Sequence, residues 1–521
     1  MALNAEERLF AGWPGVTPFA VLPDRMTTPR PATSACLSTE VDEGLLEVFA
    51  RANRPDDPME LLTLYLARVE HDLGHDCARP ELADHWRESR RRREVSSIDV
   101  LQNQATPVFI KELFNFFFRD DLYGRLERED NILLSTGSVE EERFGLPSAL
   151  RACVHYALER GWYGYSDSLG RDATRSAIAE MENAREGRTN YDATNVAVTF
   201  GGTAAVGSLV ELLARRNRNR RSGTAVVGLP NYPPLVRSIG QRFPTELVPL
   251  ACEGQRTPLR PLLDAIRTDT PLVFIQTVTN PTGARVDVNE LDRLLRTVTD
   301  STVVILDDSH DCLGPRAEGL RSLHPNLVRV RSLSKSHGAP GLKVGWILAH
   351  EEIVSEFYEL ASTAYGSPPS LFYLLTEVLA RFELWEIRDL MEPGPHELAE
   401  LAEYEPCARD LVNAYASYRI EREARERELL ALRNFTVDRA HSFSEQVFAP
   451  LCSFNVTFAP GSAGPDYLLF RRLLRRERVA FYPGILAYCL DGAWLRASPG
   501  VQKNDLVSAM DRTERFVRGL R

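Results

Sequence analysis

Between about residues 160 and 350, short apolar runs alternate with amphipathic runs of helical length. The apolar runs have the length of buried strands, and several of the segments between them have helical periodicity. Strands that recur with intervening helices predict a largely parallel sheet covered by helices on both faces. The predicted strands are 196–200, 224–228, 272–276, 303–307, 327–331 and 346–349, with predicted helices at 204–215 and 288–297.

The length of 521 residues leaves room for about three domains. We predict a mainly helical N-terminal extension over residues 1–130 and a large domain over 131–365. A helical insertion and linking helix is expected over 366–440, followed by a small C-terminal domain over 441–521, in which strand-like and helical runs alternate.

Composition excludes several classes of protein. No run of 18 or more apolar residues occurs, so no membrane span is predicted, and the N-terminus lacks the basic and apolar segments of a secretory signal. Eight cysteines without CxxC spacing predict reduced thiols in a cytoplasmic protein and no metal site. A net charge of −11 disfavours nonspecific nucleic-acid binding.

Lysine is scarce in this chain. Only Lys111, Lys335, Lys343 and Lys503 occur among 62 basic residues. A chain so rich in arginine keeps lysine mainly where a guanidinium cannot substitute, as when an amine must form an imine with an aldehyde. Lys335 lies in the Ser- and Gly-rich stretch RSLSKSHGAPGLKVGW, which makes it the candidate for such a role.

Other polar motifs follow the predicted strands. Asp307 and Asp308 end the strand 303–307, and a carboxylate at the carboxyl end of a parallel strand points into the crevice where ligands bind. Asn280 begins an Asn-Pro-Thr-Gly turn after the strand 272–276. The run GGTAA at 201–205 precedes an apolar helix, where small residues and a helix N-terminus favour a phosphate.

These motifs, in this order over about residues 130–520, resemble those of the class I/II aminotransferase family, which has fold type I and uses pyridoxal 5'-phosphate (PLP). The resemblance implies an α/β fold: an aminotransferase-like three-layer sandwich with a mostly parallel central sheet. A small C-terminal α/β domain and a helical N-terminal extension would complete it.

The resemblance also implies roles for residues around the cofactor ring. Lys335 would hold PLP as a Schiff base and, once displaced, take the α-proton of the substrate, giving a quinonoid intermediate. Asp307 would pair with the ring nitrogen, Asn280 would donate to the ring oxygen, and Tyr232 would stack on the ring. Arg496, in the stretch GAWLRAS, would bind the substrate α-carboxylate.

The cofactor phosphate would be held by Gly202, Thr203, Ser332 and Lys343. Tyr165, in the stretch WYGYSDSLG, would reach the phosphate of a neighbouring subunit, which implies a homodimer or a higher homo-oligomer with shared sites.

Two of these positions depart from the family pattern. Lys343 stands where the family usually has arginine. His310 stands where it usually has tyrosine; it serves either as a neutral donor to the ring oxygen or as a catalytic proton carrier. His337, two residues after Lys335, is a second candidate proton carrier. The aromatic run FNFFF at 114–118 either packs against the large domain or a subunit interface, or lines a pocket for a bulky second substrate.

Three reactions on an α-amino acid stay open. The family default is an aminotransferase, here with a specialised biosynthetic role. The lysine motif also resembles that of aminocyclopropane-carboxylate synthases, which implies γ-elimination on S-adenosylmethionine with cyclisation or C–C bond formation. The long N-terminal extension and the GGTAA run resemble aspartate 4-decarboxylases, which implies β-decarboxylation.

A non-enzymatic alternative resembles transcription regulators that carry an aminotransferase-like domain behind a DNA-binding head. Residues 1–130 hold 16 Lys/Arg against 24 Asp/Glu, a net charge of −8, and show no helix-turn-helix pattern. An acidic head opposes binding to phosphates, so no nucleic-acid partner is expected.

Overall fold

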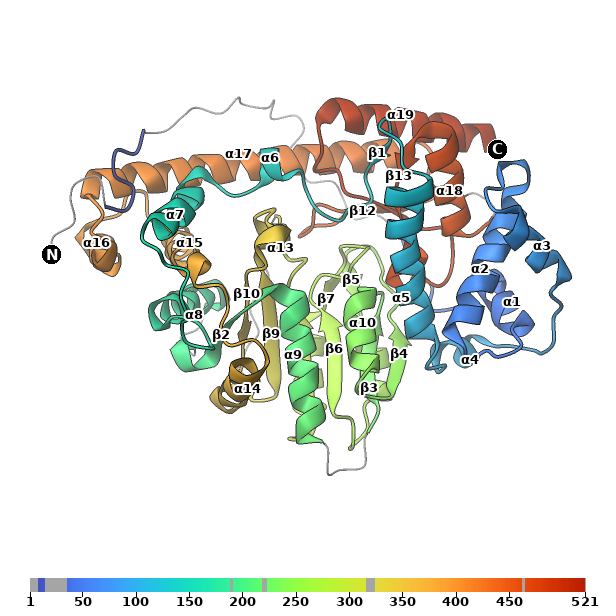
Figure 1. The fold of residues 1–521 in the computed structure, drawn as a ribbon, viewed down its shortest axis with the longest axis horizontal. Coiled ribbons are helices and arrows are strands. Elements are labelled where there is room, and N and C mark those ends of the chain that lie inside the picture. Colours follow the sequence, from blue (N-terminus) through green and yellow to red (C-terminus); the bar gives the residue numbers. More distant parts are fainter. Residues whose placement is uncertain are drawn as a thin grey trace.

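The computed structural model describes residues 8–14, 35–187, 191–217, 223–314, 324–461 and 464–520. Residues 1–7 and 15–34 of the predicted N-terminal extension lie outside the described residues. A central sheet occupies the middle of the molecule, with helices on both faces, and the long helix α17 (Ala408–His441) crosses above it (Figure 1). Among the described residues, none of the helices combines the length and the apolarity needed to cross a membrane.

The central sheet has seven strands in the order β2-β10-β9-β8-β6-β3-β4. They are β2 (Val196–Thr199), β3 (Ala225–Leu229), β4 (Thr245–Pro249), β6 (Leu272–Gln276), β8 (Val303–Asp307), β9 (Leu327–Ser332) and β10 (Gly345–Leu348). All neighbours from β9 to β4 are parallel, and β10 runs antiparallel to both β9 and β2. The mostly parallel sheet predicted from the sequence is confirmed; β4, an edge strand that mixes polar with apolar residues, is missing from the prediction.

Helices cover both faces because successive residues of a strand point to opposite sides. In β8, Val303 and Ile305 join the cluster that contains α9 and α10, whereas Val304 and Leu306 join the cluster that contains α11 and α12. The helices on these faces are α7 (Ser148–Glu159), α8 (Asp172–Glu186), α9 (Gly201–Arg216), α10 (Pro233–Gly240), α11 (Arg260–Ala265), α12 (Val288–Thr297), α14 (Glu351–Ala364) and α15 (Tyr373–Ile387). Within the predicted helical segment 366–440, α15 is buried along most of its length and packs on α8, so it belongs to the core.

The C-terminal part contains a four-stranded antiparallel sheet in the order β11-β12-β15-β14. Its elements are β11 (Gln446–Phe448), β12 (Val456–Ala459), β14 (Tyr482–Pro483) and β15 (Leu495–Ala497), with the helices α18 (Asp466–Glu477) and α19 (Lys503–Leu520). A parallel pair, β1 (Ile132–Leu133) and β13 (Val479–Ala480), joins this part to the chain that precedes the large domain. Smaller elements are α6 (Glu141–Phe144), β5 (Arg256–Thr257), β7 (Arg285–Val286), α13 (Leu333–Ser336) and α16 (Pro395–Glu400).

From Glu43 to Arg125 the described N-terminal extension is mainly helical, and it packs against the C-terminal part and against α10 (Figure 1). Its helices are α1 (Glu43–Arg51), α2 (Pro58–Leu73), α3 (Pro80–Glu88), α4 (Ser97–Leu101) and α5 (Thr106–Phe116), and α5 continues as a π-helix over Phe117–Arg125. Arg471 of α18 is fully buried and pairs with Glu70 at 2.8 Å and with Asp121 at 3.2 Å. These paired charges hold α2 and the π-helix against α18, so the described extension shares a core with the rest of the protein.

Candidate active site

A cavity of about 210 Å³ lies where the carboxyl ends of the central strands face the small domain and α5. This is the edge at which parallel α/β sheets bind their ligands. Of the predicted site residues, Tyr165 and His337 do not line it, whereas the others do: Gly202, Thr203, Tyr232, Asn280, Asp307, His310, Ser332, Lys335, Lys343 and Arg496. Residues that are up to 294 positions apart in the sequence therefore meet in one space.

Lys335 lies on the short helix α13, which Ser332 caps by accepting a hydrogen bond from the Ser334 backbone N–H at 3.1 Å. Burial and the nearby positive charge of Arg496 lower the pKa of Lys335 to about 8. An amine with this pKa is partly neutral near pH 7, and only the neutral amine attacks an aldehyde or accepts a proton.

Asp307 ends β8 beside Gln276 of β6. Burial raises the pKa of this carboxyl, and among the described residues no ion pair joins it to a cation. It accepts a hydrogen bond from the Ser309 backbone N–H at 3.0 Å. A buried carboxylate with this environment fits a protonated ring nitrogen, which would supply the missing positive charge.

The far end of the cavity suits a phosphate. Helix α9 begins at Gly201, whose φ of +78° is unfavourable for other residues, and Gly202 and Thr203 of its first turn line the cavity. A Cβ on Gly202 would lie 3.1 Å from the Ser309 hydroxyl oxygen, so a side chain there would crowd the cradle. Ser332, Ser334 and Lys343 complete this end with two hydroxyls and an amine. A helix N-terminus with these donors favours an anion.

Arg496 supplies a buried guanidinium on β15. It donates to the Asn280 side-chain oxygen at 2.8 Å and to the Ser135 carbonyl at 2.9 Å, and it stacks 4.1 Å from the centroid of the Tyr482 ring. Its Nε has no hydrogen-bond partner, and no carboxylate among the described residues pairs with it. Burial lowers its pKa to about 10. A buried cation without a counterion is costly, so the site is arranged for an incoming carboxylate.

His310 lines the cavity between the cationic groups. Burial, together with the positive charges of Lys335 and Arg496, lowers the pKa of His310 well below its usual value. The imidazole is therefore neutral near pH 7, which favours the hydrogen-bonding interpretation of His310 over that of a proton carrier. The role itself stays a prediction.

Tyr165 lies outside the cavity and is fully exposed to solvent. The structure of one chain therefore does not bring it to the predicted phosphate site, and its predicted contact requires a second subunit. Tyr232, by contrast, lines the cavity and contacts Phe114 edge-on, with ring centroids 5.7 Å apart.

Sequence reasoning missed several lining residues: Thr136, Gly137, Leu235, Gln276, Ser309, Pro340 and Tyr482. Gln276 could have been found from the sequence, because it is a polar residue at the carboxyl end of a predicted strand, where parallel sheets bind ligands. Its side-chain oxygen accepts from the Asn280 backbone N–H at 3.1 Å, and its Nε2 has no hydrogen-bond partner within the described part of the chain. Tyr482 and Thr136 carry no local signal, since only tertiary packing brings them to the cavity.

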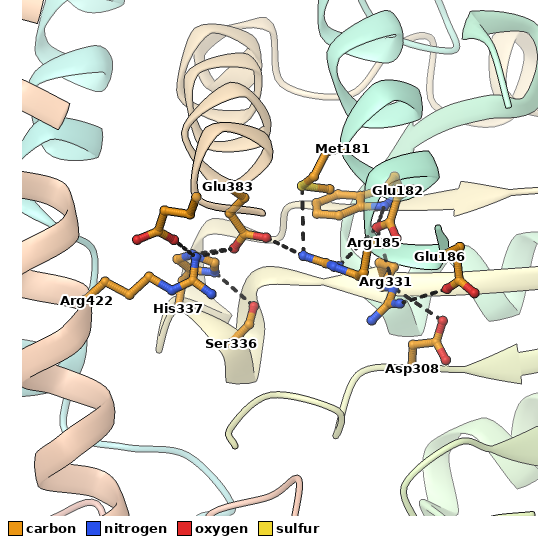
Figure 2. Close-up of polar contacts among 12 residues, drawn as sticks. Met181, Glu182, Arg185, Glu186, Asp308, Arg331, Ser336, His337, Glu383 and Arg422 are labelled. Atoms are coloured by element: carbon orange, nitrogen blue, oxygen red, sulfur yellow. Dashed lines mark hydrogen bonds and ion pairs between the residues drawn. The ribbon is translucent and has the colours of Figure 1, made fainter. Parts of the chain in front are cut away.

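A second, smaller cavity of about 110 Å³ lies on the other side of α13. Several of its charged side chains form ion pairs with one another, among them Arg185, Glu383 and Arg422 (Figure 2). Arg185 pairs with Glu383, and the Glu383 carboxylate lies 3.5 Å from His337 Nε2. Burial and nearby arginines lower the pKa of His337 to about 3, so His337 is neutral and faces away from the predicted cofactor. The position of His337 in this second cavity does not support the prediction that it carries protons at the cofactor.

The same network reaches the backbone of the candidate lysine. Arg425 of α17 donates to the Lys335 carbonyl oxygen at 3.3 Å and to the Phe144 carbonyl oxygen at 2.7 Å. Asp308 accepts from Arg329 Nε at 2.8 Å and lies 3.3 Å from Arg331 Nε. The back of α13 is thus tied to α17 by hydrogen bonds from Arg425 to backbone carbonyls, and behind it Asp308 forms ion pairs with two arginines of β9.

Comparisons with known proteins agree with this geometry. The model of the family Aminotransferase class I and II matches residues 129–389. Histidinol-phosphate aminotransferase 1 of Mannheimia succiniciproducens is 29% identical over 244 residues, which cover 44% of this chain and 61% of that protein. The aromatic amino acid aminotransferase of Mycolicibacterium smegmatis is 36% identical over 129 residues, which cover 24% of this chain and 35% of that protein. The matches thus span about a third to three fifths of these relatives.

Solved structures share the fold. An aspartate aminotransferase double mutant from Thermus thermophilus matches with a TM-score of 0.60 and 20% identity, over 79% of this chain and 96% of that one. An aromatic aminotransferase from Pyrococcus horikoshii matches with a TM-score of 0.61 and 18% identity, over 75% and 97%. These likenesses confirm the predicted fold type I architecture. The match to the family model, over half of the chain, shows that the chain belongs to the PLP-dependent class I and II aminotransferase family.

Proposed function

We propose that this protein transfers the amino group of an α-amino acid to PLP held in the 210 Å³ cavity and from there to an oxo acid. The observation that carries the proposal is the meeting of Lys335, whose pKa is about 8, with a buried Arg496 that lacks a carboxylate partner among the described residues. One group handles the amine and the α-proton, and the other receives the α-carboxylate.

In this proposal each residue of the cavity has a role that follows from its position. Arg496 binds and orients the α-carboxylate with its planar fork. Lys335 accepts the α-proton at Nζ, because burial keeps part of its amine neutral. Asp307, with Gln276 beside it, stabilises positive charge at the ring nitrogen. PLP, when bound, supplies an aldehyde for the amino group and a ring that accepts the electrons of the broken bond.

A dimer completes the proposed site. Tyr165 is fully exposed on a loop away from its own cavity, which supports a role in the cavity of a second copy of the chain. In this arrangement the tyrosine hydroxyl of each subunit contacts the phosphate bound by its partner. The substitutions at Lys343 and His310 relative to the family pattern support a specialised biosynthetic role.

γ-Elimination from S-adenosylmethionine and β-decarboxylation of an acidic amino acid begin with the same binding of the amine and carboxylate. The aromatic rings of Phe114, Tyr232 and Tyr482 around the cavity would also attract a sulfonium cation, which is the observation in favour of S-adenosylmethionine. The three reactions differ in their products, so detecting the products distinguishes them.

The test is the visible spectrum of the PLP-loaded protein, titrated separately with common amino acids and with S-adenosylmethionine. Transamination predicts that an amino acid bleaches the absorption band of the lysine-bound cofactor and that an oxo acid restores it. Release of methylthioadenosine from S-adenosylmethionine, without response to other amino acids, would replace transamination by γ-elimination. Loaded Lys335→Ala protein is the control and should lack the band.

A further inference from the structure

We infer that Phe114 and Phe118 form the wall that receives the side chain of the substrate, and that this side chain is large and apolar or aromatic. The inference rests on the proposed function, because it assumes that Arg496 holds the α-carboxylate. Both phenylalanines precede the segment 129–389 that matches the family, so this wall comes from the N-terminal extension.

The aromatic run at 114–118 divides into faces. Phe114 and Phe118 are four residues apart, which places them on one side of a helix, and both line the cavity. Phe117 is fully buried and packs on Phe470 with centroids 4.7 Å apart. The Arg79 guanidinium covers Phe116 at 4.7 Å. Phe117 thus packs against the C-terminal part, whereas Phe114 and Phe118 line the cavity, and the pocket for a bulky substrate stays a prediction for these two residues.

The wall continues to the proposed carboxylate site through aromatic contacts. The Phe114 centroid lies 4.9 Å from that of Phe118 and 6.5 Å from that of Tyr482, and Tyr482 stacks on Arg496. A substrate whose carboxylate binds Arg496 therefore has an aromatic surface within reach of its side chain. Edge-on contacts of this kind favour an aromatic or bulky apolar group.

The charges of the cavity argue against an acidic side chain. The lining cations in the described part are Lys335, Lys343 and Arg496, which are used by the amine chemistry, the phosphate and the α-carboxylate. Lys111 lies on α5 beside Phe114, but its amine is hydrogen-bonded to Asn115 and does not line the cavity. A second carboxylate at the wall would therefore be desolvated without a cation among the residues that line the described cavity.

The wall is held in place before substrate arrives. Asp121 of the π-helix accepts hydrogen bonds from Tyr467 at 2.9 Å and from Arg471 at 3.2 Å, and all three side chains are buried. A wall fixed in this way loses little conformational entropy on binding, which favours specificity for shape. π-Helical turns are also frequent at functional sites.

The experiment measures the dissociation constants of 3-phenylpropionate and of succinate for the PLP-loaded protein by titration calorimetry. Both ligands carry a carboxylate that can bind Arg496. At its other end, 3-phenylpropionate has a phenyl ring and succinate has a second carboxylate. We expect 3-phenylpropionate to bind more tightly than succinate. Phe114→Ala and Phe118→Ala should each weaken 3-phenylpropionate about tenfold and leave succinate unchanged.

Phe116→Ala is the matched control, since it removes a ring from the same helix on the side of Arg79 and should leave the ratio of the two constants unchanged. Phe114→Leu and Phe118→Leu keep apolar volume and should give smaller losses, which protects the test if the alanine variants fold poorly. Tighter binding of succinate, or equal weakening of both ligands by the cavity variants, would overturn the inference.

Failure of the inference differs from failure of the proposed function. If acidic amino acids bleach the cofactor band and 3-phenylpropionate does not bind, transamination stands and the aromatic wall has no role in specificity. If no amino acid changes the band, the proposed function fails. In that second case the binding constants of the two ligands still show whether Phe114 and Phe118 contact an apolar ligand.

Discussion

Asp307 and Asp308 are neighbours at the end of β8, yet they belong to opposite sides of α13. Asp307 lines the front cavity, where burial raises its pKa. Asp308 lines the back cavity, where Arg329 and Arg331 overcome the effect of burial and lower its pKa. The opposite directions of the two pKa shifts distinguish a carboxylate that is available to a ligand from one that is already paired and stabilises the fold.

A similar contrast separates Lys335 and Arg496 in front from Arg329 behind α13. In front, Lys335 and Arg496 have lowered pKa values, and Arg496 has no carboxylate partner among the described residues. Behind α13, Arg329 has a raised pKa because of Asp308 and Glu186, with which it pairs. Burying an unpaired charge costs free energy of folding that a bound ligand of opposite charge can offset, whereas a paired charge already has its partner within the protein.

The largest expected effect is on the front. Lys335→Ala removes the group that binds the cofactor and accepts the α-proton, so we expect turnover to fall by at least about 10³-fold. Loss of the visible band and of turnover checks this. The control is Lys343→Arg, which keeps a cation at the phosphate end and should retain the band. Unchanged turnover in the alanine variant would assign the chemistry to another group.

The second prediction tests whether Arg496 binds the α-carboxylate of the substrate. Arg496→Gln should raise the KM for an amino acid about 100-fold, because a charged hydrogen-bonded pair with the α-carboxylate is lost. Steady-state kinetics check this, with an amine that lacks the carboxylate as comparison substrate. If both substrates suffer equally, Arg496 acts through the shape of the cavity.

The third prediction compares the two carboxylates directly. Asp308→Asn should lower the free energy of unfolding by about 3 kcal/mol, since it breaks a buried ion pair. Asp307→Asn should leave the stability of the cofactor-free protein unchanged or raise it, because a raised pKa marks a carboxylate that burial disfavours. Denaturant unfolding of both variants checks this.

The pH dependence of the third prediction follows from the sign of the shift. The folded pKa of Asp308 is lowered, so its contribution is present above the ordinary carboxylate pKa of about 4 and is lost as the pH falls through the folded value. The stability difference between the wild type and Asp308→Asn should therefore shrink below about pH 4. A difference that is constant with pH would contradict the paired state of Asp308.

The fourth prediction concerns the amine of Lys335. Because the folded pKa is about 8, the rate at which the cofactor-free protein takes up PLP should rise with pH and level off above about pH 8. Arg496→Gln removes a positive neighbour and should move this midpoint upward. A midpoint near pH 10.5, the ordinary lysine pKa, would contradict the effect of burial.

The smallest effect is expected behind α13. Arg425→Gln removes one hydrogen bond to the Lys335 carbonyl and one to that of Phe144, and should lower kcat about fivefold. A shift in the pH at which the cofactor band changes would show that Arg425 positions Lys335, which mere loss of stability would not produce. Arg425→Lys should restore part of kcat.

Much of the fold could be predicted because its signals are local. The strands 272–276 and 303–307 match β6 and β8, and the helix 288–297 matches α12, because buried strands and amphipathic helices leave periodic patterns. Lys335, Asp307 and Asn280 also carry local signals, since each lies just after or at the end of a predicted strand. The edge strand β4 was not predicted, because its polar residues interrupt the apolar run that indicates a buried strand.

The sequence alone determined the order of the strands and helices, the scarcity of lysine and the motifs at strand ends, because these depend on neighbours in the chain. Only the tertiary structure decided that Phe114 and Phe118 face the cavity and Phe117 the core, and that Asp307 awaits a partner while Asp308 is paired. Burial and charge pairing arise between residues far apart in the sequence, and they set the chemistry of each side chain.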